Sequence, residues 1–421
     1  AVSASLAVSA SLAVSASLAV SASLAVFASL ASNTGCGAMT DAHDETSDFA
    51  ASIYDLPDTI LKGIYAYGFE TMSPIQQKSL RWILGGRDMI IQAQSGTGKT
   101  AAFGIGAAVR ALASERGRPS VAIVCHTREL ARQTHVVVGE LARFSELRVG
   151  LCMGGTTVRE DTEALAAGMD IVVGTPGRMQ TLVKRGLLRL DGLRSLVIDE
   201  VDVILRDVSS NSFLPCITDL LSACSEATQL LLVSATVPDE LLAMTETVLR
   251  DPVKILVPND ALPLAGIDQA QIHVADEAQR LAIAEALRYS VVGVQVMVFC
   301  SSRDEVDAVA AHFQAMGTPV AKIHSGIEQA QRNREMREFR SGKASTMVCT
   351  DVLARGVDVQ QVGLVILMHV PTAADTYLHC VGRCGRYGRQ GRAVTIAAEY
   401  ELTQLRSIQQ LYDLELPVRS L

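Results

Sequence analysis

The stretch from residue 89 to residue 104 has the residue types that bind the phosphates of a nucleotide. It reads Met-Ile-Ile-Gln-Ala-Gln-Ser-Gly-Thr-Gly-Lys-Thr-Ala-Ala-Phe-Gly, an apolar strand-like run followed by a glycine-rich turn and by helix formers. Gly96 and Gly98 let the backbone curl so that its amides face one point, and the helix N-terminus adds partial positive charge there. Lys99 can reach the outer phosphates, and Thr100 can hold a magnesium ion.

The predicted phosphate loop departs from the usual pattern at its first position, where Ala93 replaces a glycine. An accidental glycine-rich turn is therefore the alternative, and the flanking strand and helix favour the nucleotide site. We expect the nucleotide to contact Ala93, Gln94, Ser95, Gly96, Thr97, Gly98, Lys99 and Thr100.

Two adjacent carboxylates follow an apolar run about one hundred residues downstream, in Leu-Val-Ile-Asp199-Glu200-Val201-Asp202. Asp199 can hold magnesium through water, opposite Thr100, and Glu200 can orient or deprotonate a water for attack on a γ-phosphate. A solvated turn is the usual explanation of an isolated Asp-Glu pair. The apolar strand before it and the phosphate loop upstream indicate a catalytic pair instead.

Composition limits both the architecture and the partners. At 421 residues the chain suggests about two domains, and 49% hydrophobic residues are enough for substantial cores. The net charge of -8 argues against wholesale electrostatic coating of nucleic acid or membrane, so any polyanion must be bound by local groups. The nine cysteines form no CxxC pair, and several lie inside apolar runs, which indicates reduced, buried thiols and a reducing compartment.

Short apolar runs, separated by segments of helix-compatible length, must position these groups. Continuous Val/Ile/Leu runs that alternate with helices indicate parallel strands covered on both faces, here in two doubly wound sheets. The runs are 88–93, 121–126, 149–153, 170–174, 196–199, 229–234 and 253–257, then 295–300, 320–324, 346–349, 364–369 and 393–398. Polar clusters follow the carboxyl ends of these runs, where ligands bind in open α/β sheets.

The chain therefore divides into four predicted segments. Residues 1–30 repeat Ala-Val-Ser-Ala-Ser-Leu four times and then once as Ala-Val-Phe-Ala-Ser-Leu, so we expect 1–47 to be an unstructured low-complexity appendage, with membrane and targeting roles as alternatives. The first α/β domain spans 48–257, and the second spans 268–421. The segment 258–267 contains two prolines and a glycine and is predicted to be the linker.

These motifs together resemble the DEAD-box RNA helicases, most closely the translation initiation factor 4A group, over residues 50–421. The resemblance implies two RecA-like domains. The segment from residue 63 to residue 77 resembles the adenine-reading Q motif of that family, which implies that Phe69 stacks on adenine and that Gln76 hydrogen-bonds its edge. Ser234-Ala-Thr236 resembles the motif that couples hydrolysis to strand separation, although Ser and Thr often only cap a strand end.

The resemblance also implies contacts with RNA and with ATP from both domains. The RNA contacts are Thr127, Arg128, Gly154, Gly155, Thr175, Pro176, Gly177 and Arg178 in the first domain, and Gln329, Arg332, Thr350 and Asp351 in the second. Backbone amides and isolated Arg side chains suit a phosphate backbone, so sequence-independent binding is expected. In the second domain Gly356 and Asp358 contact ATP, and Arg383 and Arg386, three residues apart on one predicted helix face, reach the γ-phosphate as arginine fingers.

Four positions depart from the family pattern. His126 replaces the Pro before Thr-Arg-Glu-Leu, Val201 replaces Ala after Asp-Glu, and His-Ser-Gly at 324–326 stands where His-Gly-Asp is usual. His126 and Val201 are expected to leave the chemical groups intact. Cys380 replaces an Arg, which removes a positive charge expected near the RNA and ATP interface.

We predict an ATP-dependent RNA helicase that uses ATP and Mg²⁺ and binds RNA through its backbone. The alternatives are an ATP-gated RNA clamp with little turnover and a scaffold that has lost catalysis. Lys99, Glu200, Arg383 and Arg386 argue against the scaffold. A monomer with protein partners that modulate domain closure is expected, without membrane association, in the cytoplasm or alternatively the nucleus.

Overall fold

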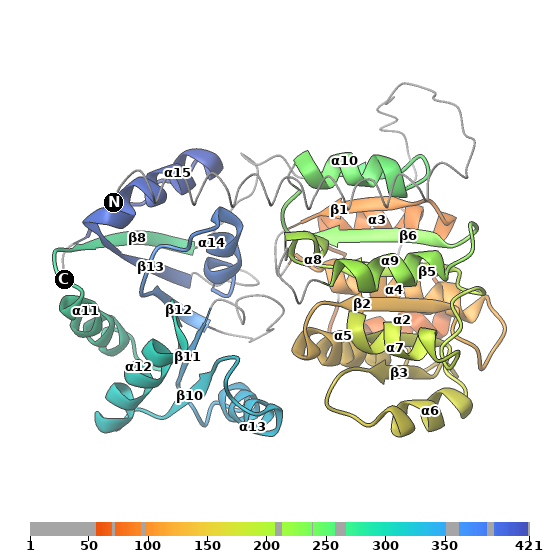
Figure 1. Cartoon of the computed structure of the whole chain (residues 1–421), viewed down its shortest axis with the longest axis horizontal. Helices are drawn as coiled ribbons and strands as arrows, with labels where there is room; N and C mark the ends of the chain where they lie inside the picture. Colours follow the sequence, from red (N-terminus) through yellow and green to blue (C-terminus); the bar gives the residue numbers. More distant parts are fainter. Residues whose placement is uncertain are drawn as a thin grey trace. The chain divides into compact units, whose positions relative to one another are not determined.

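The computed structural model describes residues 56–69, 72–93, 97–206, 213–237, 239–256, 267–350, 362–384 and 391–419. The predicted N-terminal appendage and most of the predicted linker lie outside these residues. The chain forms two compact units, one ending at Leu256 and the other beginning at Val257 (Figure 1). Each is described by itself below.

The first unit is built on a seven-stranded sheet in which every strand pair is parallel. Its strand order is β3 (Val149–Cys152), β4 (Ile171–Gly174), β2 (Val121–Cys125), β5 (Ser195–Asp199), β6 (Gln229–Ser234), β1 (Met89–Gln92) and β7 (Val253–Ile255). The central strands are buried along their whole length, because helices cover both faces of the sheet.

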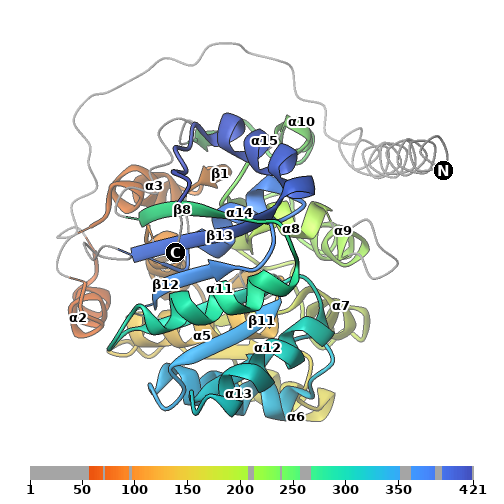
Figure 2. The same ribbon diagram turned by 90° about the vertical axis from the view of Figure 1, so that its left-hand side faces the viewer.

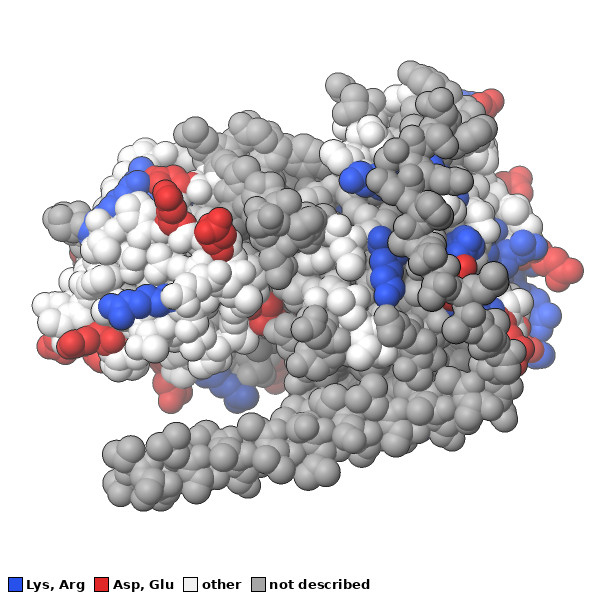
Figure 3. Space-filling view, turned by 90° about the horizontal axis from the view of Figure 1, so that it is seen from above, with Lys and Arg blue, Asp and Glu red and all other residues white. Residues whose placement is uncertain are grey.

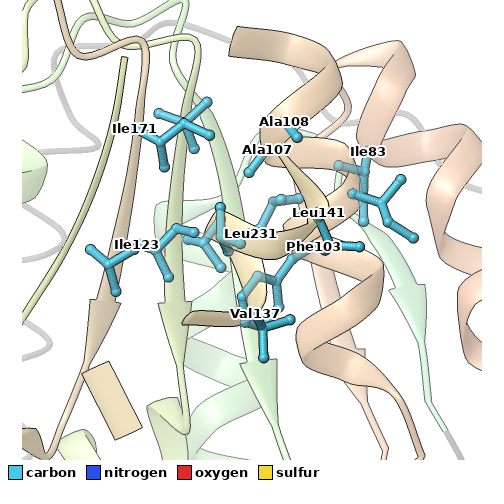
Figure 4. Close-up of a cluster of buried hydrophobic side chains, with 14 of the residues drawn as sticks. Ile83, Phe103, Ala107, Ala108, Ile123, Val137, Leu141, Ile171 and Leu231 are labelled. Atoms are coloured by element: carbon cyan, nitrogen blue, oxygen red, sulfur yellow. The ribbon is translucent and has the colours of Figure 1, made fainter. Parts of the chain in front are cut away.

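Two apolar cores occupy the two faces of this sheet. On one face pack α2 (Asp58–Ala66), α3 (Pro74–Gly85), α4 (Lys99–Leu112) and α5 (Arg128–Leu141). Figure 4 shows part of that core, where Phe103 of α4 lies among Ile83, Val137 and Leu141. On the other face lie α6 (Val158–Ala166), α7 (Pro176–Lys184), α8 (Val201–Arg206), α9 (Leu214–Ser222) and α10 (Asp239–Val248).

The second unit has a six-stranded sheet, again with parallel pairs. Its order is β10 (Val320–Ile323), β11 (Thr346–Thr350), β9 (Gln295–Cys300), β12 (Val362–Leu367), β13 (Gly391–Ala398) and β8 (Ile267–Val274). One face carries α11 (Ala278–Tyr289) and α12 (Arg303–Ala315), as Figure 2 shows. The other carries α13 (Gln329–Arg340), α14 (Ala374–Val381), the 3₁₀ turn η4 (Glu399–Glu401) and α15 (Leu402–Tyr412).

The two doubly wound sheets confirm the predicted fold class, and each predicted apolar run overlaps a strand. The prediction missed β8, which begins at Ile267, the residue assigned to the end of the linker. This strand reads Ile-Asp-Gln-Ala-Gln-Ile-His-Val and pairs along its whole length with β13 at the edge of the sheet. Because an edge strand is covered on fewer sides, it carries polar residues and lacks the apolar run that marked the others.

A buried ionic network joins three elements of the second unit. Arg280 of α11, whose side chain is 2% exposed, pairs with Glu401 and Glu277 and donates to the carbonyl oxygen of Ile396 at 2.7 Å. His369, just after β12, places Nε2 2.8 Å from Glu305 and Nδ1 3.4 Å from Glu401. Burial alone would lower the pKa of His369, but its hydrogen bonds to Glu305 and Glu401 outweigh burial and raise the pKa to about 9.

The raised pKa of His369 predicts a specific loss of stability in alkali. Because the folded pKa exceeds the usual 6.5, the stabilisation is fully present below about pH 6.5 and is lost as the pH rises through about 9. Thermal denaturation of the unmodified chain and of His369→Gln, followed from pH 6 to pH 10, should give a difference in Tm that narrows across this window. A difference that stays constant would show that the imidazolium does not stabilise the network.

Candidate active site

The first turn of α4 carries the predicted phosphate-binding residues. Lys99 begins the helix, and Gly98 precedes it with φ 94°, in the left-handed region that favours glycine. A Cβ on Gly98 would lie 2.5 Å from Nε2 of Gln76, so a side chain at this position would also displace the end of the Gln76 side chain. Thr97, Lys99 and Thr100 are half-buried, Ala93 is buried at the end of β1, and residues 94–96 lie outside the described residues.

Gln76 connects the predicted adenine-reading segment to the phosphate loop. Its Oε1 accepts the backbone N–H of Ser73, the N-cap of α3, at 2.8 Å. Its Nε2 donates to the carbonyl oxygen of Gly98 at 3.2 Å. Phe69 is half-buried, and its ring centroid lies 4.9 Å from that of Tyr67. The structure thus brings Gln76 into contact with the phosphate loop. The positions of the two motifs along the chain could not show this contact.

The predicted catalytic carboxylates lie at the carboxyl end of β5. Asp199, Glu200 and Asp202 are all buried, and Asp199 Oδ1 accepts the backbone N–H of Glu200 at 3.0 Å. Glu200 has φ 53°, a left-handed conformation that costs a non-glycine residue about 1 to 3 kcal/mol. Such strain is typical of a side chain held in place for function.

The carboxylate of Asp199 has an unusual environment. Burial and then the charge of Glu200 raise its pKa to about 7, and Lys99 acts in the opposite direction. A divalent cation would favour the charged form, and a carboxylate with a Thr hydroxyl supplies the oxygen ligands that Mg²⁺ prefers. Among the described residues no group of three or more His, Cys, Asp or Glu side chains gathers as a metal site.

The loop after β6 contacts this carboxylate cluster. Thr236 Oγ1 donates to Asp202 Oδ2 at 3.0 Å, and the hydroxyl of Ser234 donates to the carbonyl oxygen of Thr236. Sequence reasoning named Ser234 and Thr236 but not Asp202 as their partner. The contact forms because β5 and β6 are neighbours in the sheet. The sequence does not indicate strand order, so this contact could not be predicted from it.

His126 lies beside the predicted catalytic carboxylate, which its position in the sequence does not show. The register pairs Cys125 of β2 with Asp199 of β5, so the next residues, His126 and Glu200, leave neighbouring strands side by side. Nδ1 of His126 lies 3.1 Å from Oε2 of Glu200, and both side chains are largely buried. The structure thus places the imidazole of His126 against the predicted catalytic carboxylate, and the expectation that His126 leaves the chemical groups intact stays a prediction.

The predicted RNA-contacting residues of the first unit follow β2, β3 and β4, which are neighbours in the sheet. Thr127 caps α5, where its Oγ1 accepts the N–H of Leu130 at 3.1 Å. The guanidinium of Arg128 lies against Gly154, where a Cβ would come within 2.8 Å of Nη2. Gly155 has φ 100°, which also requires glycine. These contacts place Arg128 and the Gly154-Gly155 turn together.

Arg178 has protein partners of its own. It forms an ion pair with Asp161, which is buried, and its Nη2 donates to the carbonyl oxygen of Thr156 at 2.6 Å. The Thr175-Pro176-Gly177 segment begins α7, with Thr175 as N-cap and Pro176 in the first turn. Arg178 is thus held in a fixed position beside the Gly154-Gly155 turn by groups of the first unit.

In the second unit the structure describes part of the predicted site. Gln329 and Arg332 lie on the first turn of α13, and Thr350 ends β11. Residues 351, 356, 358 and 386 lie outside the described residues. Arg383 is buried, and its Nε donates to the carbonyl oxygen of His379 at 3.1 Å. The helix α14 ends at Val381, before Arg383, so the predicted shared helix face for Arg383 and Arg386 is wrong.

Cys380 lies in the interior of the second unit. It is 1% exposed and packs in the apolar core of the second unit with Tyr377 and Leu405. Its side chain therefore contributes to core packing at a position where the family pattern has a charged residue.

Comparison with known proteins identifies the family. Residues 73–244 match the DEAD/DEAH box helicase domain, and residues 279–388 match the helicase conserved C-terminal domain. The chain is 40% identical to the ATP-dependent RNA helicase eIF4A of Aspergillus fumigatus over 380 residues, which cover 90% of this chain and 92% of the relative. It is 41% identical to the eIF4A of Neosartorya fischeri, with 90% and 94% covered. The chain belongs to the DEAD-box family of ATP-dependent RNA helicases.

Solved structures of other DEAD-box helicases resemble the chain along most of its length. S. cerevisiae Dbp5 bound to RNA and ADP BeF3 aligns with a TM-score of 0.80 at 28% identity, covering 86% of this chain and 94% of Dbp5. A Dbp5 variant bound to a Gle1 variant and IP6 aligns with a TM-score of 0.71 at 27% identity, with 91% and 96% covered. The DEAD-box assignment makes this chain an RNA-dependent ATPase.

One face of this DEAD-box helicase carries described side chains of both charges. On the face shown in Figure 3, described Lys and Arg side chains are interspersed with Asp and Glu. A mixed surface agrees with the net charge of -8 and with RNA binding by a few local groups. Within the part of the chain that the structure describes, no helix is long and apolar enough to cross a membrane.

Proposed function

We propose that the helicase binds ATP and RNA on two halves of one edge of its first sheet. The supporting observation is the strand order. The carboxyl ends of parallel strands share one edge, and β3, β4 and β2 carry the RNA candidates while β5, β6 and β1 carry the ATP candidates. The two sets are therefore adjacent without overlapping.

In the ATP half, the chain's own groups have distinct tasks. The backbone of residues 93–98 and Lys99 bind the phosphates, while Phe69 and Gln76 bind the adenine. Thr100 and Asp199 hold Mg²⁺, which neutralises charge that develops on the phosphates. Glu200 orients the attacking water and accepts its proton. Thr236, bonded to Asp202, connects this cluster to the loop after β6.

In the RNA half, Thr127, Arg128, Gly154, Gly155 and the first turn of α7 bind phosphates of the backbone. Helix N-termini and glycine amides offer donors to phosphate oxygens, and these groups read no base edges. RNA binding by this half is therefore independent of sequence.

The second domain completes both sites in this proposal. Gln329, Arg332, Thr350 and Asp351 contact RNA, and Gly356, Asp358, Arg383 and Arg386 contact ATP. The proposed domains are 48–257 and 267–421, the second beginning with β8, joined by 258–266, with 1–47 as an appendage. RNA that binds both domains favours the closed state by its differential affinity, which makes ATP hydrolysis RNA-dependent.

We further propose a cytoplasmic monomer that remodels RNA in translation, with protein partners that modulate closure. The similarity to eIF4A supports the process, and the Dbp5 complex with Gle1 gives an example of a partner on a related chain.

Steady-state ATPase with and without RNA tests this proposal. Unrelated single-stranded RNAs should stimulate turnover to a similar extent, and binding should weaken with salt, by a log-log slope of about -0.7 for each phosphate contact. Arg128→Ala should reduce that slope, whereas Arg189→Ala, in the exposed pair with Asp191, serves as the control. Nucleotide-dependent RNA binding with little turnover would instead support the RNA clamp. Strong preference for one RNA sequence would contradict the backbone-only contacts.

A further inference from the structure

Asp161 is the one buried residue of α6, a helix that the structure describes in full. Its side chain is 3% exposed, whereas a surface helix usually packs through an apolar stripe. Asp161 is not needed as a cap. Thr157 Oγ1 accepts the N–H of Glu160 at 3.2 Å, and Glu160 Oε2 accepts the N–H of Thr157 at 2.9 Å, which together close the start of the helix. The buried carboxylate therefore has another task.

The carboxylate of Asp161 joins two segments of the proposed RNA half. Its Oδ2 forms the ion pair with Nη1 of Arg178, in the first turn of α7. Its Oδ1 lies 3.2 Å from Oγ1 of Thr156, the residue directly after the Gly154-Gly155 turn. Arg178 completes the network, since Nη1 donates to Oγ1 of Thr156 at 3.3 Å and Nη2 donates to its carbonyl oxygen at 2.6 Å.

We propose that Asp161 is a positioning residue for RNA binding, which fixes the Gly154-Gly155 turn against the start of α7. This inference rests on the proposed RNA half. Glycines leave a turn conformationally free, so amides that bind successive phosphates need support from outside the turn. Before the turn, the carbonyl oxygen of Cys152 accepts the N–H of Thr175 at 3.0 Å. After the turn, the Asp161 network holds Thr156. The turn is thus held on both sides against α7.

An ion pair suits this task better than an apolar contact. Apolar residues of similar size would anchor α6 at least as well, because the desolvation of a buried pair offsets most of its attraction. The planar fork of the Arg178 guanidinium fixes direction as well as distance, which an apolar contact does not.

The charge of Asp161 gives the proposal a test of sign. A carboxylate beside phosphate-binding groups repels RNA, so charge alone predicts that removing it strengthens RNA binding. Positioning predicts that removing it weakens RNA binding.

Asp161→Asn tests this sign, because it keeps the size of the side chain and removes its charge. We expect the RNA concentration for half-maximal stimulation of the ATPase to rise by about tenfold or more, since hydrogen bonds between charged groups are worth that much. Turnover at saturating RNA and the KM for ATP should change little, because the ATP candidates follow other strands. Glu163→Gln is the matched control. It removes an exposed carboxylate from the same helix and should not weaken RNA binding.

A second pair of variants reaches the network without changing the ion pair. Thr156→Val keeps the branched shape without the hydroxyl, whereas Thr156→Ser keeps the hydroxyl. The Val variant should weaken RNA binding by about threefold or more, and the Ser variant should retain most of the affinity. Thermal denaturation checks that all variants fold. If Asp161→Asn does not fold, the Thr156 pair decides.

The outcomes distinguish this inference from the proposed function. If Arg128→Ala leaves RNA binding unchanged, the proposed RNA half itself is wrong. If Arg128→Ala weakens RNA binding while Asp161→Asn keeps or strengthens it, the positioning role alone is overturned. Equal RNA affinity in the Val and Ser variants of Thr156 would also overturn it. Loss of ATP affinity or of saturated turnover in Asp161→Asn would show that the residue supports the fold of the whole unit instead.

Discussion

Replacing Glu200 by Gln is expected to lower RNA-stimulated kcat by about a hundredfold to ten-thousandfold, the range of general acid–base contributions. Gln has nearly the same shape but cannot accept the proton of the attacking water. The carboxylate acts mainly in the transition state, so ATP affinity should be kept. Steady-state turnover and equilibrium binding of a labelled ATP analogue measure the two quantities separately.

Lys99→Ala is the matched comparison, because Lys99 meets phosphate in the ground state. It should lose ATP binding, in contrast to Glu200→Gln. Equal ATP affinity in Lys99→Ala and the unmodified chain would disprove the phosphate-loop assignment. Loss of binding in Glu200→Gln would mean that Glu200 supports the fold of the loop rather than the chemistry.

Arg386→Ala is expected to reduce turnover by about a thousandfold or more, the typical contribution of an arginine finger. The reason is the family pattern, in which Arg386 neutralises charge on the γ-phosphate during transfer. RNA affinity in the absence of nucleotide should change little, because the assigned RNA contacts do not include this side chain. RNA-stimulated ATPase and nucleotide-free RNA binding of the same preparation give the comparison.

Arg406→Ala provides the control for removing a positive charge from the second domain, since Arg406 lies exposed on α15. Its ATPase should match that of the unmodified chain.

The isolated segment 48–257 keeps Lys99 and Glu200 but lacks Arg386, so it should hydrolyse ATP far more slowly than the full chain. Full turnover by that segment, or by Arg386→Ala, would contradict a two-domain mechanism.

The sequence alone predicts the local elements of this protein and the groups proposed to do its chemistry. The strand, turn and helix around Lys99 follow from short-range rules, because apolar runs, glycine at φ 94° and helix formers act within a few residues. The adjacent carboxylates Asp199 and Glu200 could be recognised for the same reason, because the apolar strand directly before them is a local pattern. The polar edge strand β8 and the end of α14 at Val381 were missed, since neither the pattern nor the composition at those positions was distinctive.

Tertiary structure alone decided which of these groups meet. Strand order is set by helix packing and by crossover connections that join residues far apart in the chain, and no local signal encodes it. The order β3-β4-β2-β5-β6-β1-β7 brings Thr236 to Asp202, separates the RNA candidates from the ATP candidates, and pairs β2 with β5. That last pairing places His126 against Glu200, 74 residues further along the chain, so a departure from the family pattern lies beside the proposed catalytic carboxylate.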